Sequence, residues 1–371
     1  MNPDAGAGTS SGLGARVTRA FLFGSTAAVF AAHLALWLWV SWRTELPFTQ
    51  LLNRWDSNHY SHIIRDGYSG TLWAFFPLYP MTVRALAALL GEERVQVLGA
   101  VLSSLLFLGF VGLVGRASAR EDPPPGLVPR TRLGWLFFLL APASYAFHSH
   151  HTESLFLLLS FLSLFFGASR RPGLAGLFAA LCVPTRNQGV FVVAAASVLA
   201  ALREEGPPAR RVRAFLLCGA LGALGVLGFL AFEYVAAGSP LAFVDAQRGW
   251  NRARSVAEVF NTFVFGNPWQ NTRGPYLLRY GLYWVLLVGT ALLARRQPAL
   301  GLYAALSLGV MLLQGDIANV YRFGTVVFPL FFFLGDWSAR RPAWFQGVVL
   351  LVLLLLNLST ARGYALGKWA Y

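Results

Sequence analysis

The sequence predicts an all-α polytopic membrane protein with about 11 transmembrane helices and an interfacial helix in its first external loop. Hydrophobic residues make up 56% of the 371 residues and charged residues only 12%, and the mean hydropathy is +0.55. Soluble proteins carry roughly 25% charged residues. Arginines cluster at the ends of the apolar runs. The formal charge of +14 therefore indicates topology signals and contacts with membrane lipids, and we expect no nucleic-acid partner.

Residues 1–15 are rich in Gly, Ala and Ser, which predicts a disordered cytoplasmic tail ahead of a single transmembrane domain over 16–371. The first apolar run, Val17 to Trp42, is too long for a signal-peptide core and ends in tryptophans, so we expect a retained span. A crossing helix needs about 20 residues, so the shorter runs, above all within 172–202, leave the exact number of spans open. The later runs lie at 95–116, 133–147, 154–169, 172–186, 188–202, 214–236, 276–293, 298–313, 323–336 and 343–360.

Short basic connections orient the chain, because Lys and Arg favour short cytoplasmic loops. Arg16 and Arg19 place the N-terminus in the cytoplasm, and every second short connection that follows is basic. The basic connections are 116–132, 170–171, 203–213, 295–296 and 340–341. The long loops 43–94 and 237–275 and the C-terminus then lie outside. Segment 74–90 is apolar enough to resemble a span, but its two prolines and Arg84 predict an interfacial position. If it crossed, every later loop would change sides.

The first external loop carries an amphipathic pattern. Leu52, Trp55, His59 and Ile63 recur at helical spacing and predict a helix on the bilayer surface that Gly67 closes. Asp56 then lies beside an interfacial tryptophan, at the depth where a lipid phosphate meets water. A solvated loop carboxylate is the alternative interpretation of Asp56, and it is the one that we adopt for Asp66.

The sequence lacks the motifs expected for ion-coupled transport, nucleotide binding and metal binding. No charged side chain lies between Val95 and Val114, whereas ion-coupled transporters place ionisable groups at mid-membrane. There is no GxxxxGK[ST] loop for a nucleotide and no DxD pair for a metal diphosphate. His148, His150 and His151 follow no standard zinc spacing. We therefore predict no metal site and no cofactor.

Five blocks of the sequence resemble one family. Arg54–Pro80, with RWD, DGY and AFFPLYP, is similar to the opening motif of the GPI mannosyltransferase 2 (PIG-V-like) family, in the GT-C class of membrane glycosyltransferases. The likeness continues, in order and over about 280 residues, through Ala141–Phe156, Pro184–Val190, Gln247–Asn251 and Tyr321–Phe332.

The blocks also depart from the family pattern at two places. The family usually has Tyr-Ser-Glu where this chain has His151-Thr152-Glu153, and often Arg-Ser-Asn-Gly where this chain has Arg186-Asn187-Gln188-Gly189. These departures affect the identity of the sugar and of the acceptor that the resemblance implies more than they affect the class of reaction.

The resemblance implies a GT-C-like bundle that transfers mannose from polyprenyl-phosphate-mannose to a glycolipid or glycan acceptor, with inversion. Asp56 matches the acidic residue that aligns the acceptor in this class. Arg186 and Arg322 fall at predicted external span ends, where a guanidinium could bind phosphate oxygens or simply snorkel to the interface. Glu153 could hold acceptor hydroxyls or a sugar, or cap a helix. The remaining candidates for substrate binding are Arg54, Trp55, His59 and Asn187.

Alternatives from other classes stay open. A lipid or glycolipid transporter or flippase could use the same external groove, and a catalytically silent subunit of a glycan-assembly complex would keep the same fold. Trp250 and Trp269 in the second long loop could stack on sugar rings, although an interfacial aromatic belt predicts them too. We expect the protein in the bacterial cytoplasmic membrane with its site facing outside, or in the endoplasmic reticulum of a eukaryote.

Overall fold

The computed structural model describes residues 12–250, 274–313, 317 and 319–370. Most of the expected N-terminal tail and much of the second long loop, with Asn251 and Trp269, lie outside the described residues. Residues 12–15 are described, and Leu13 and Ala15 accept backbone hydrogen bonds from the start of the helix Arg132–Leu139 (α6). The predicted disorder therefore does not extend to them.

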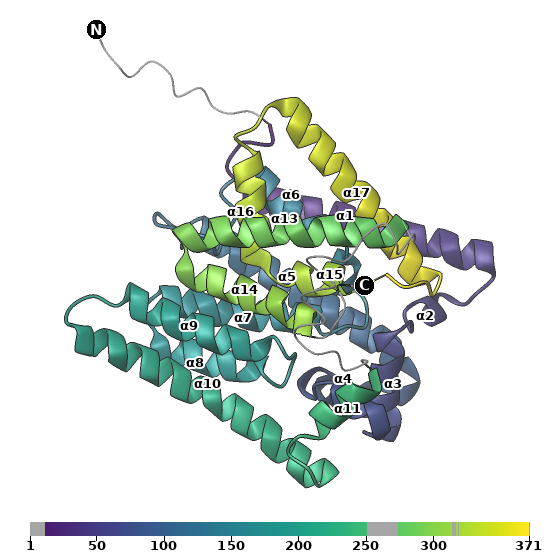
Figure 1. Cartoon of the computed structure of the whole chain (residues 1–371). Helices are drawn as coiled ribbons and strands as arrows, with labels where there is room; N and C mark the ends of the chain where they lie inside the picture. Colours follow the sequence, from purple (N-terminus) through teal and green to yellow (C-terminus); the bar gives the residue numbers. More distant parts are fainter. Residues whose placement is uncertain (1–11, 251–273, 314–316, 318, 371) are drawn as a thin grey trace.

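The described chain is all-α, as predicted. Within it every regular element is a helix, and the recorded β-type pairing is a single bridge between Arg16 and Thr131. Figure 1 shows the helices packed as a bundle, with the first loop and its short helices at one end.

Four helices of the described chain are long and apolar enough to cross a membrane. They are Arg19–Thr44 (α1), Glu92–Ser118, which joins the short 3₁₀ helix Glu92–Arg94 (η2) to Val95–Ser118 (α5), Pro208–Ala237 (α10) and Ala343–Ala365 (α17). Their 26, 27, 30 and 23 residues correspond to about 35–45 Å at 1.5 Å per residue. Many of their large apolar side chains are exposed, as the surface of a membrane protein requires. The predicted number of about 11 spans is not confirmed by this finding.

Further helices of the described chain pack with these four. They are α6, Glu153–Ala168 (α7), Pro172–Cys182 (α8), Gly189–Arg203 (α9), Gly274–Arg296 (α13), Pro298–Leu313 (α14), Val320–Thr325 (α15) and Phe328–Ser338 (α16). Helices α8 and α9 have 11 and 15 residues, about 16 and 22 Å, so neither matches the thickness of a hydrocarbon core by itself. The non-helical segment 183–188 between them is tolerated because protein, rather than lipid, surrounds it.

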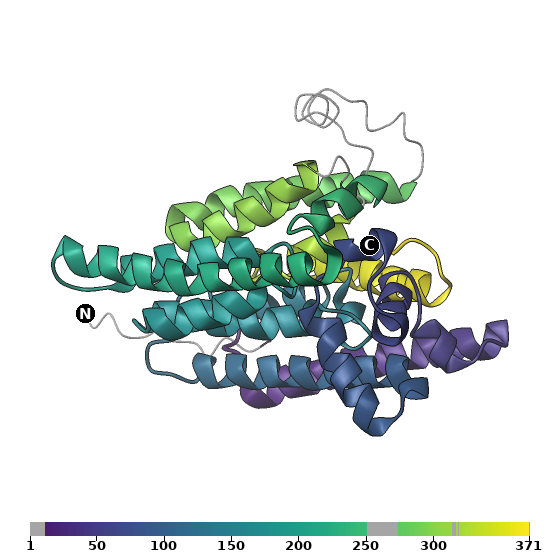
Figure 2. The same ribbon diagram turned by 90° about the horizontal axis from the view of Figure 1, so that it is seen from below.

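Basic connections gather at one end of the bundle. Arg16 donates to the carbonyl of Ser118 at 3.0 Å. The backbone N–H groups of Arg130 and Thr131 both donate to the Asp336 carboxylate at 2.9 Å. Figure 2 shows this end, with the α9–α10 turn, opposite the end that carries the first loop. The basic connections thus lie at one end of the bundle, and the long first loop lies at the other.

The first loop forms Phe48–Leu51 (α2), Asp56–Asp66 (α3), the turn Gly70–Ala74 (η1) and Leu78–Leu90 (α4). Helix α4 has 13 residues and folds back along the start of α5, where the Tyr79 hydroxyl donates to the carbonyl of Gly99 at 3.1 Å. A helix that returns in this way does not run the length of the bundle. The interfacial position of 74–90 stays a prediction.

Helix α3 corrects the predicted pattern at its start. Gly67 closes it as expected, with φ +89° and its N–H donating to the carbonyl of Ile63. The helix begins only at Asp56, however, so Leu52 and Trp55 lie outside it. Its buried face consists of Ser57, Tyr60, Ser61, Ile63 and Ile64. This face packs on the histidine-rich segment and on α4. The buried face of α3 is therefore set by these tertiary contacts and differs from the apolar face predicted from the spacing of Leu52, Trp55, His59 and Ile63.

Candidate functional site

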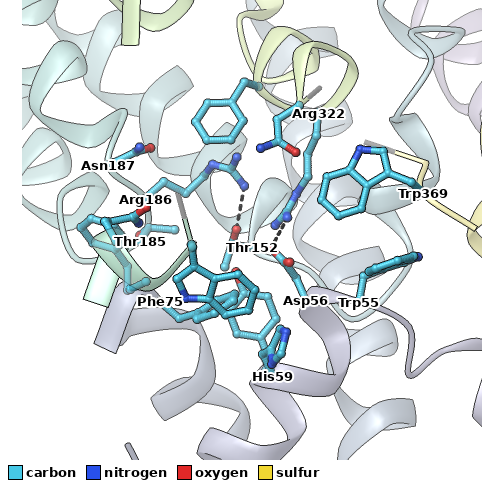
Figure 3. Close-up of a pocket in the computed structure, with 17 residues that line it drawn as sticks. Trp55, Asp56, His59, Phe75, Thr152, Thr185, Arg186, Asn187, Arg322 and Trp369 are labelled. Carbon is cyan, nitrogen blue, oxygen red and sulfur yellow. Dashed lines mark hydrogen bonds and ion pairs between the residues drawn. The ribbon is translucent and has the colours of Figure 1, made fainter. Parts of the chain in front are cut away.

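A cavity of about 560 Å³ opens at the end of the bundle that carries the first loop. It lies between α3, η1, the connections before α7 and α9, the end of the helix Ala242–Trp250 (α11), α15 and the C-terminal segment (Figure 3). The lining residues are Trp55, Asp56, His59, Tyr60, Ala74, Phe75, Phe76, Thr152, Thr185, Arg186, Asn187, Gln247, Trp250, Asn319, Arg322, Phe323 and Trp369.

Four charged side chains form a connected cluster at this cavity. Nη1 of Arg186 donates to Oε1 of Glu153 at 2.7 Å and to the Thr152 hydroxyl at 2.9 Å. Arg322 donates from Nε to the same Glu153 oxygen and from Nη1 to Asp56. The Glu153 side chain is 0% exposed and each arginine 7%, whereas Asp56 is 26% exposed. Residues from four distant segments thus form one charge network.

Local structure explains where each charge lies. Asp56 and Glu153 are the first residues of α3 and α7, and a helix N-terminus favours an acidic side chain. Arg186 comes from the connection between α8 and α9, and its guanidinium lies 5.3 Å from the ring centre of Phe323. Arg322 comes from the short helix α15. Each arginine therefore reaches the cavity from a short segment between longer helices.

Aromatic side chains form the cavity walls. The indole N–H of Trp55 donates to the carbonyl of Lys368 at 3.0 Å, and its ring meets Trp369 edge to face at 5.0 Å. On the other side, Trp250 donates to the carbonyl of Thr71 at 2.9 Å. The His59 ring lies 5.0 Å from that of Trp250. The walls thus join the first loop to α11 and to the C-terminal segment.

Trp55, which directly precedes Asp56 in the cavity wall, has an unusual backbone conformation. Trp55 adopts φ +52° and ψ −124°, a region that non-glycine residues rarely occupy. The contacts of its indole ring hold it there and thereby fix the start of α3.

Burial lowers the pKa of His59, and the nearby Asp56 only partly opposes that effect. His59 is therefore a neutral hydrogen-bonding group of the cavity at neutral pH.

The three clustered histidines turn to different partners. His148 Nε2 lies 2.8 Å from Nδ1 of His33, His150 Nδ1 lies 2.9 Å from the Tyr79 hydroxyl, and His151 Nδ1 lies 2.8 Å from the Ser149 hydroxyl. Burial lowers the pKa of His150 to about 3 and that of His151 to about 4. Across the described ranges, no group of three or more potential metal ligands comes together.

Six of the eight predicted site residues line the cavity: Trp55, Asp56, His59, Arg186, Asn187 and Arg322. Glu153 does not line it but lies behind the two arginines, fully buried. Arg54 does not line it either, and its guanidinium lies beside Gly367. The structure therefore places neither of these two where a direct substrate contact would need it.

Other lining residues were not identified from the sequence. Thr152 and Thr185 adjoin predicted residues, and Gln247 lies in the QRGWN block, so these three had a local signal. Trp369 had none. It reaches Trp55 only because the end of α17 returns to the first loop.

Comparisons of this chain with protein-family models, with curated proteins and with solved structures find no match.

Proposed function

We propose that this protein is a membrane glycosyltransferase that moves a hexose from a polyprenyl-phosphate sugar to an acceptor hydroxyl. The observation that carries the proposal is the cavity in which the Asp56 carboxylate meets the Arg186 and Arg322 guanidinium groups between aromatic walls. The motif resemblance adds mannose as the sugar and a glycolipid or glycan as the acceptor.

In such a transfer the carboxylate of Asp56 and the guanidinium groups of Arg186 and Arg322 act at different steps. The acceptor oxygen attacks the anomeric carbon, and the bond from that carbon to the phosphate oxygen breaks with its electron pair staying on the phosphate. The acceptor proton becomes acidic as its oxygen forms the new bond, and Asp56 accepts it. The lipid phosphate leaves as a dianion, which the two guanidinium groups stabilise. The leaving group needs no general acid, because the phosphate is a stable anion.

The walls suit the rest of the substrate. Trp55, Trp250 and Trp369 offer ring faces and edges to sugar C–H groups, and Asn187, Gln247 and Asn319 offer donors and acceptors to sugar hydroxyls. Within this proposal Glu153 is a positioning residue that holds both arginines and touches no substrate. Arg54 does not line the cavity, and the proposed transfer gives it no contact with the substrate.

We propose that about 11 spans cross the membrane, with the basic end in the cytoplasm and the cavity outside. The gathering of basic connections at the end opposite the cavity supports this orientation. The short helices would then cross together with their non-helical extensions. On this basis we propose the bacterial cytoplasmic membrane, or the endoplasmic reticulum in a eukaryote.

The test compares two aspartates of one loop. Asp56→Asn keeps the size of the side chain but removes its basicity, so turnover should fall by roughly 10²–10⁴-fold, the usual contribution of a general base. Transfer is measured on purified protein with polyprenyl-phosphate-mannose, a panel of glycan acceptors and a chelator, and GDP-mannose should not replace the donor. Asp66→Asn is the control, because Asp66 is 60% exposed and pairs with His62 on the same helix at 2.9 Å.

The outcome also separates the enzyme from a transporter. A folded Asp56→Asn protein with near-normal transfer would remove Asp56 from the mechanism. Lipid movement without sugar transfer in the wild-type protein would favour the transporter or flippase. Transfer from GDP-mannose, or complete loss of transfer with chelator, would show that the donor class is wrong.

A further inference from the structure

Tyr60 is a buried tyrosine whose hydroxyl has no hydrogen-bond partner among the described residues. The residue is 4% exposed, and its ring meets those of Phe75 and Tyr79 edge to face at 5.4 Å. A buried tyrosine hydroxyl usually has a partner. Tyrosines of the described chain with 0% exposure each donate to a backbone carbonyl, and they are Tyr79, Tyr145, Tyr283, Tyr303 and Tyr364. Tyr60 departs from that pattern.

The position of Tyr60 connects it to the candidate site. Tyr60 lines the cavity together with Asp56 and His59. All three belong to α3, and residues three and four positions apart lie on the same face of a helix. The helix face that carries the proposed base therefore also carries Tyr60, one turn further along.

The charges around the Tyr60 hydroxyl indicate what it is close to. Burial raises the pKa of Tyr60 to about 12, the Arg322 guanidinium opposes that effect, and Asp56, Glu153 and Arg186 act on the same group. The hydroxyl is thus near all four charged side chains of the cluster, and it keeps its proton at neutral pH. A protonated phenol donates one hydrogen bond. It brings a donor to this part of the cavity without bringing a charge.

We propose that the Tyr60 hydroxyl donates a hydrogen bond to the phosphate of the lipid substrate, beside the guanidinium groups of Arg186 and Arg322. This inference rests on the proposed function and adds a neutral group to the residues that bind the phosphate. Burial of a hydroxyl without a hydrogen bond is unfavourable. A phosphate oxygen supplies the acceptor, and a hydrogen bond to a charged acceptor is stronger than one between neutral groups.

The test is a binding experiment that needs no turnover. The full chain is purified in detergent, and calorimetry measures the dissociation constant of farnesyl phosphate, a prenyl monophosphate like the leaving group of the proposed transfer. Tyr60→Phe removes the hydroxyl and keeps the ring, so farnesyl phosphate should bind roughly tenfold more weakly. Farnesol has the same prenyl chain without the phosphate, and its affinity should change by less than about twofold.

Two other changes of tyrosine to phenylalanine are matched controls. The Tyr68 hydroxyl is also buried without a partner among the described residues, but Tyr68 does not line the cavity. Tyr68→Phe should therefore keep the affinity for farnesyl phosphate within about twofold of the wild type. Tyr79 donates to the carbonyl of Gly99, so Tyr79→Phe breaks a hydrogen bond of the fold and should lower the melting temperature.

The melting temperature of the ligand-free protein separates phosphate binding from a structural role of Tyr60. Tyr60→Phe should not lower it, because the substitution breaks no hydrogen bond of the fold and removes a buried polar group. A structural role predicts the opposite, a lower melting temperature with unchanged affinity. A lower melting temperature in Tyr60→Phe would contradict the unpaired hydroxyl on which the proposal depends.

Three binding results would overturn the assignment of Tyr60. They are no detectable binding of farnesyl phosphate to the wild type, equal affinity in the wild type and Tyr60→Phe, and equal weakening for farnesyl phosphate and farnesol. Failure of the proposed function is seen separately in the transfer assay. The expected binding pattern without sugar transfer would contradict the enzyme and leave the assignment standing, and sugar transfer without the binding pattern would do the reverse.

Discussion

The carboxylates of Asp56 and Glu153 bind the same arginine, yet their surroundings differ. Glu153 is enclosed by Arg186, Arg322 and Thr152 and has no exposed surface. Asp56 keeps a quarter of its side-chain surface and faces the cavity. Both residues are the first residue of a helix, so burial is what distinguishes them, and the proposed mechanism gives the positioning role to Glu153 and the role of base to Asp56 on that ground.

Buried histidines make the fold sensitive to acid. The pKa values of His150 and His151 are lowered to about 3 and about 4, mainly by burial, whereas an unfolded chain has values near 6.5. Below pH 6.5 the unfolded state binds protons that the folded state does not. The stability that comes from the neutral rings is thus complete above pH 6.5 and is lost as the pH falls toward 4.

We therefore expect the melting temperature of the detergent-solubilised protein to fall between pH 7 and pH 5. Each of the two histidines contributes up to about 1.4 kcal/mol per pH unit below 6.5. This window lies above the range in which most carboxylates titrate. His151→Asn removes one titrating ring and should reduce the slope of melting temperature against pH. An equal slope in wild type and variant would contradict the assignment.

At the scale of elements, α8 and α10 approach each other through glycine. A Cβ atom at Gly225 would lie 2.2 Å from the carbonyl oxygen of Ala180, and one at Gly176 would lie 2.6 Å from that of Cys218. The two backbones can therefore pack this closely only where side chains are absent. Close packing of small residues is a common way to join helices in a membrane, where lipid is as apolar as the side chains.

Gly225→Ala should separate α8 from α10 and destabilise the protein by about 1–3 kcal/mol, the usual cost of overpacking. Gly228→Ala is the matched control, because it lies one turn further along α10 and a Cβ atom there has no neighbour within 4 Å. The control should be neutral or slightly stabilising, since alanine favours a helix over glycine. Thermal unfolding of the two purified variants measures the difference. Equal melting temperatures would show that the two helices separate at little cost.

At the scale of the whole molecule, the basic connections and the cavity lie at opposite ends. Arg16, Arg130 and Asp336 lie at one end, and Asp56 with its arginines lies at the other. A chain that alternates between the two ends places every second connection on the same side. The proposed site can therefore work as one unit only if all of its connections face the same side of the membrane.

Reporter fusions test this arrangement directly. Alkaline phosphatase is active only outside the cytoplasm, so fusions after Ala119 and Arg171 should be inactive, and fusions after Trp73 and Tyr371 active. An active fusion after Arg171 would place Asp56 and Glu153 on opposite faces of the membrane. That result would contradict the shared site.

The sequence by itself determined the all-α class, a helix in the first loop, the closure of α3 at Gly67 and six of the residues around the cavity. These features depend on local information: apolar runs, arginines at their ends, a glycine with positive φ, and short motifs. The start of α3 was predicted too early, because the true start depends on the position of Trp55. Its contacts with Lys368 and Trp369 come from the far end of the chain.

Only the tertiary structure decided how these residues share their charges. Glu153 was a candidate for sugar binding, and its enclosure behind Arg186 and Arg322 follows from the packing of α7 against the 183–188 connection and α15. Arg54 lies beside Gly367 rather than in the cavity for a similar reason. Periodicity and motifs report what a residue is and which local face it occupies. The partners that neutralise a buried charge come from separate segments of the chain, 33 residues apart for Arg186 and Glu153 and 169 for Arg322 and Glu153, and no local pattern specifies that pairing.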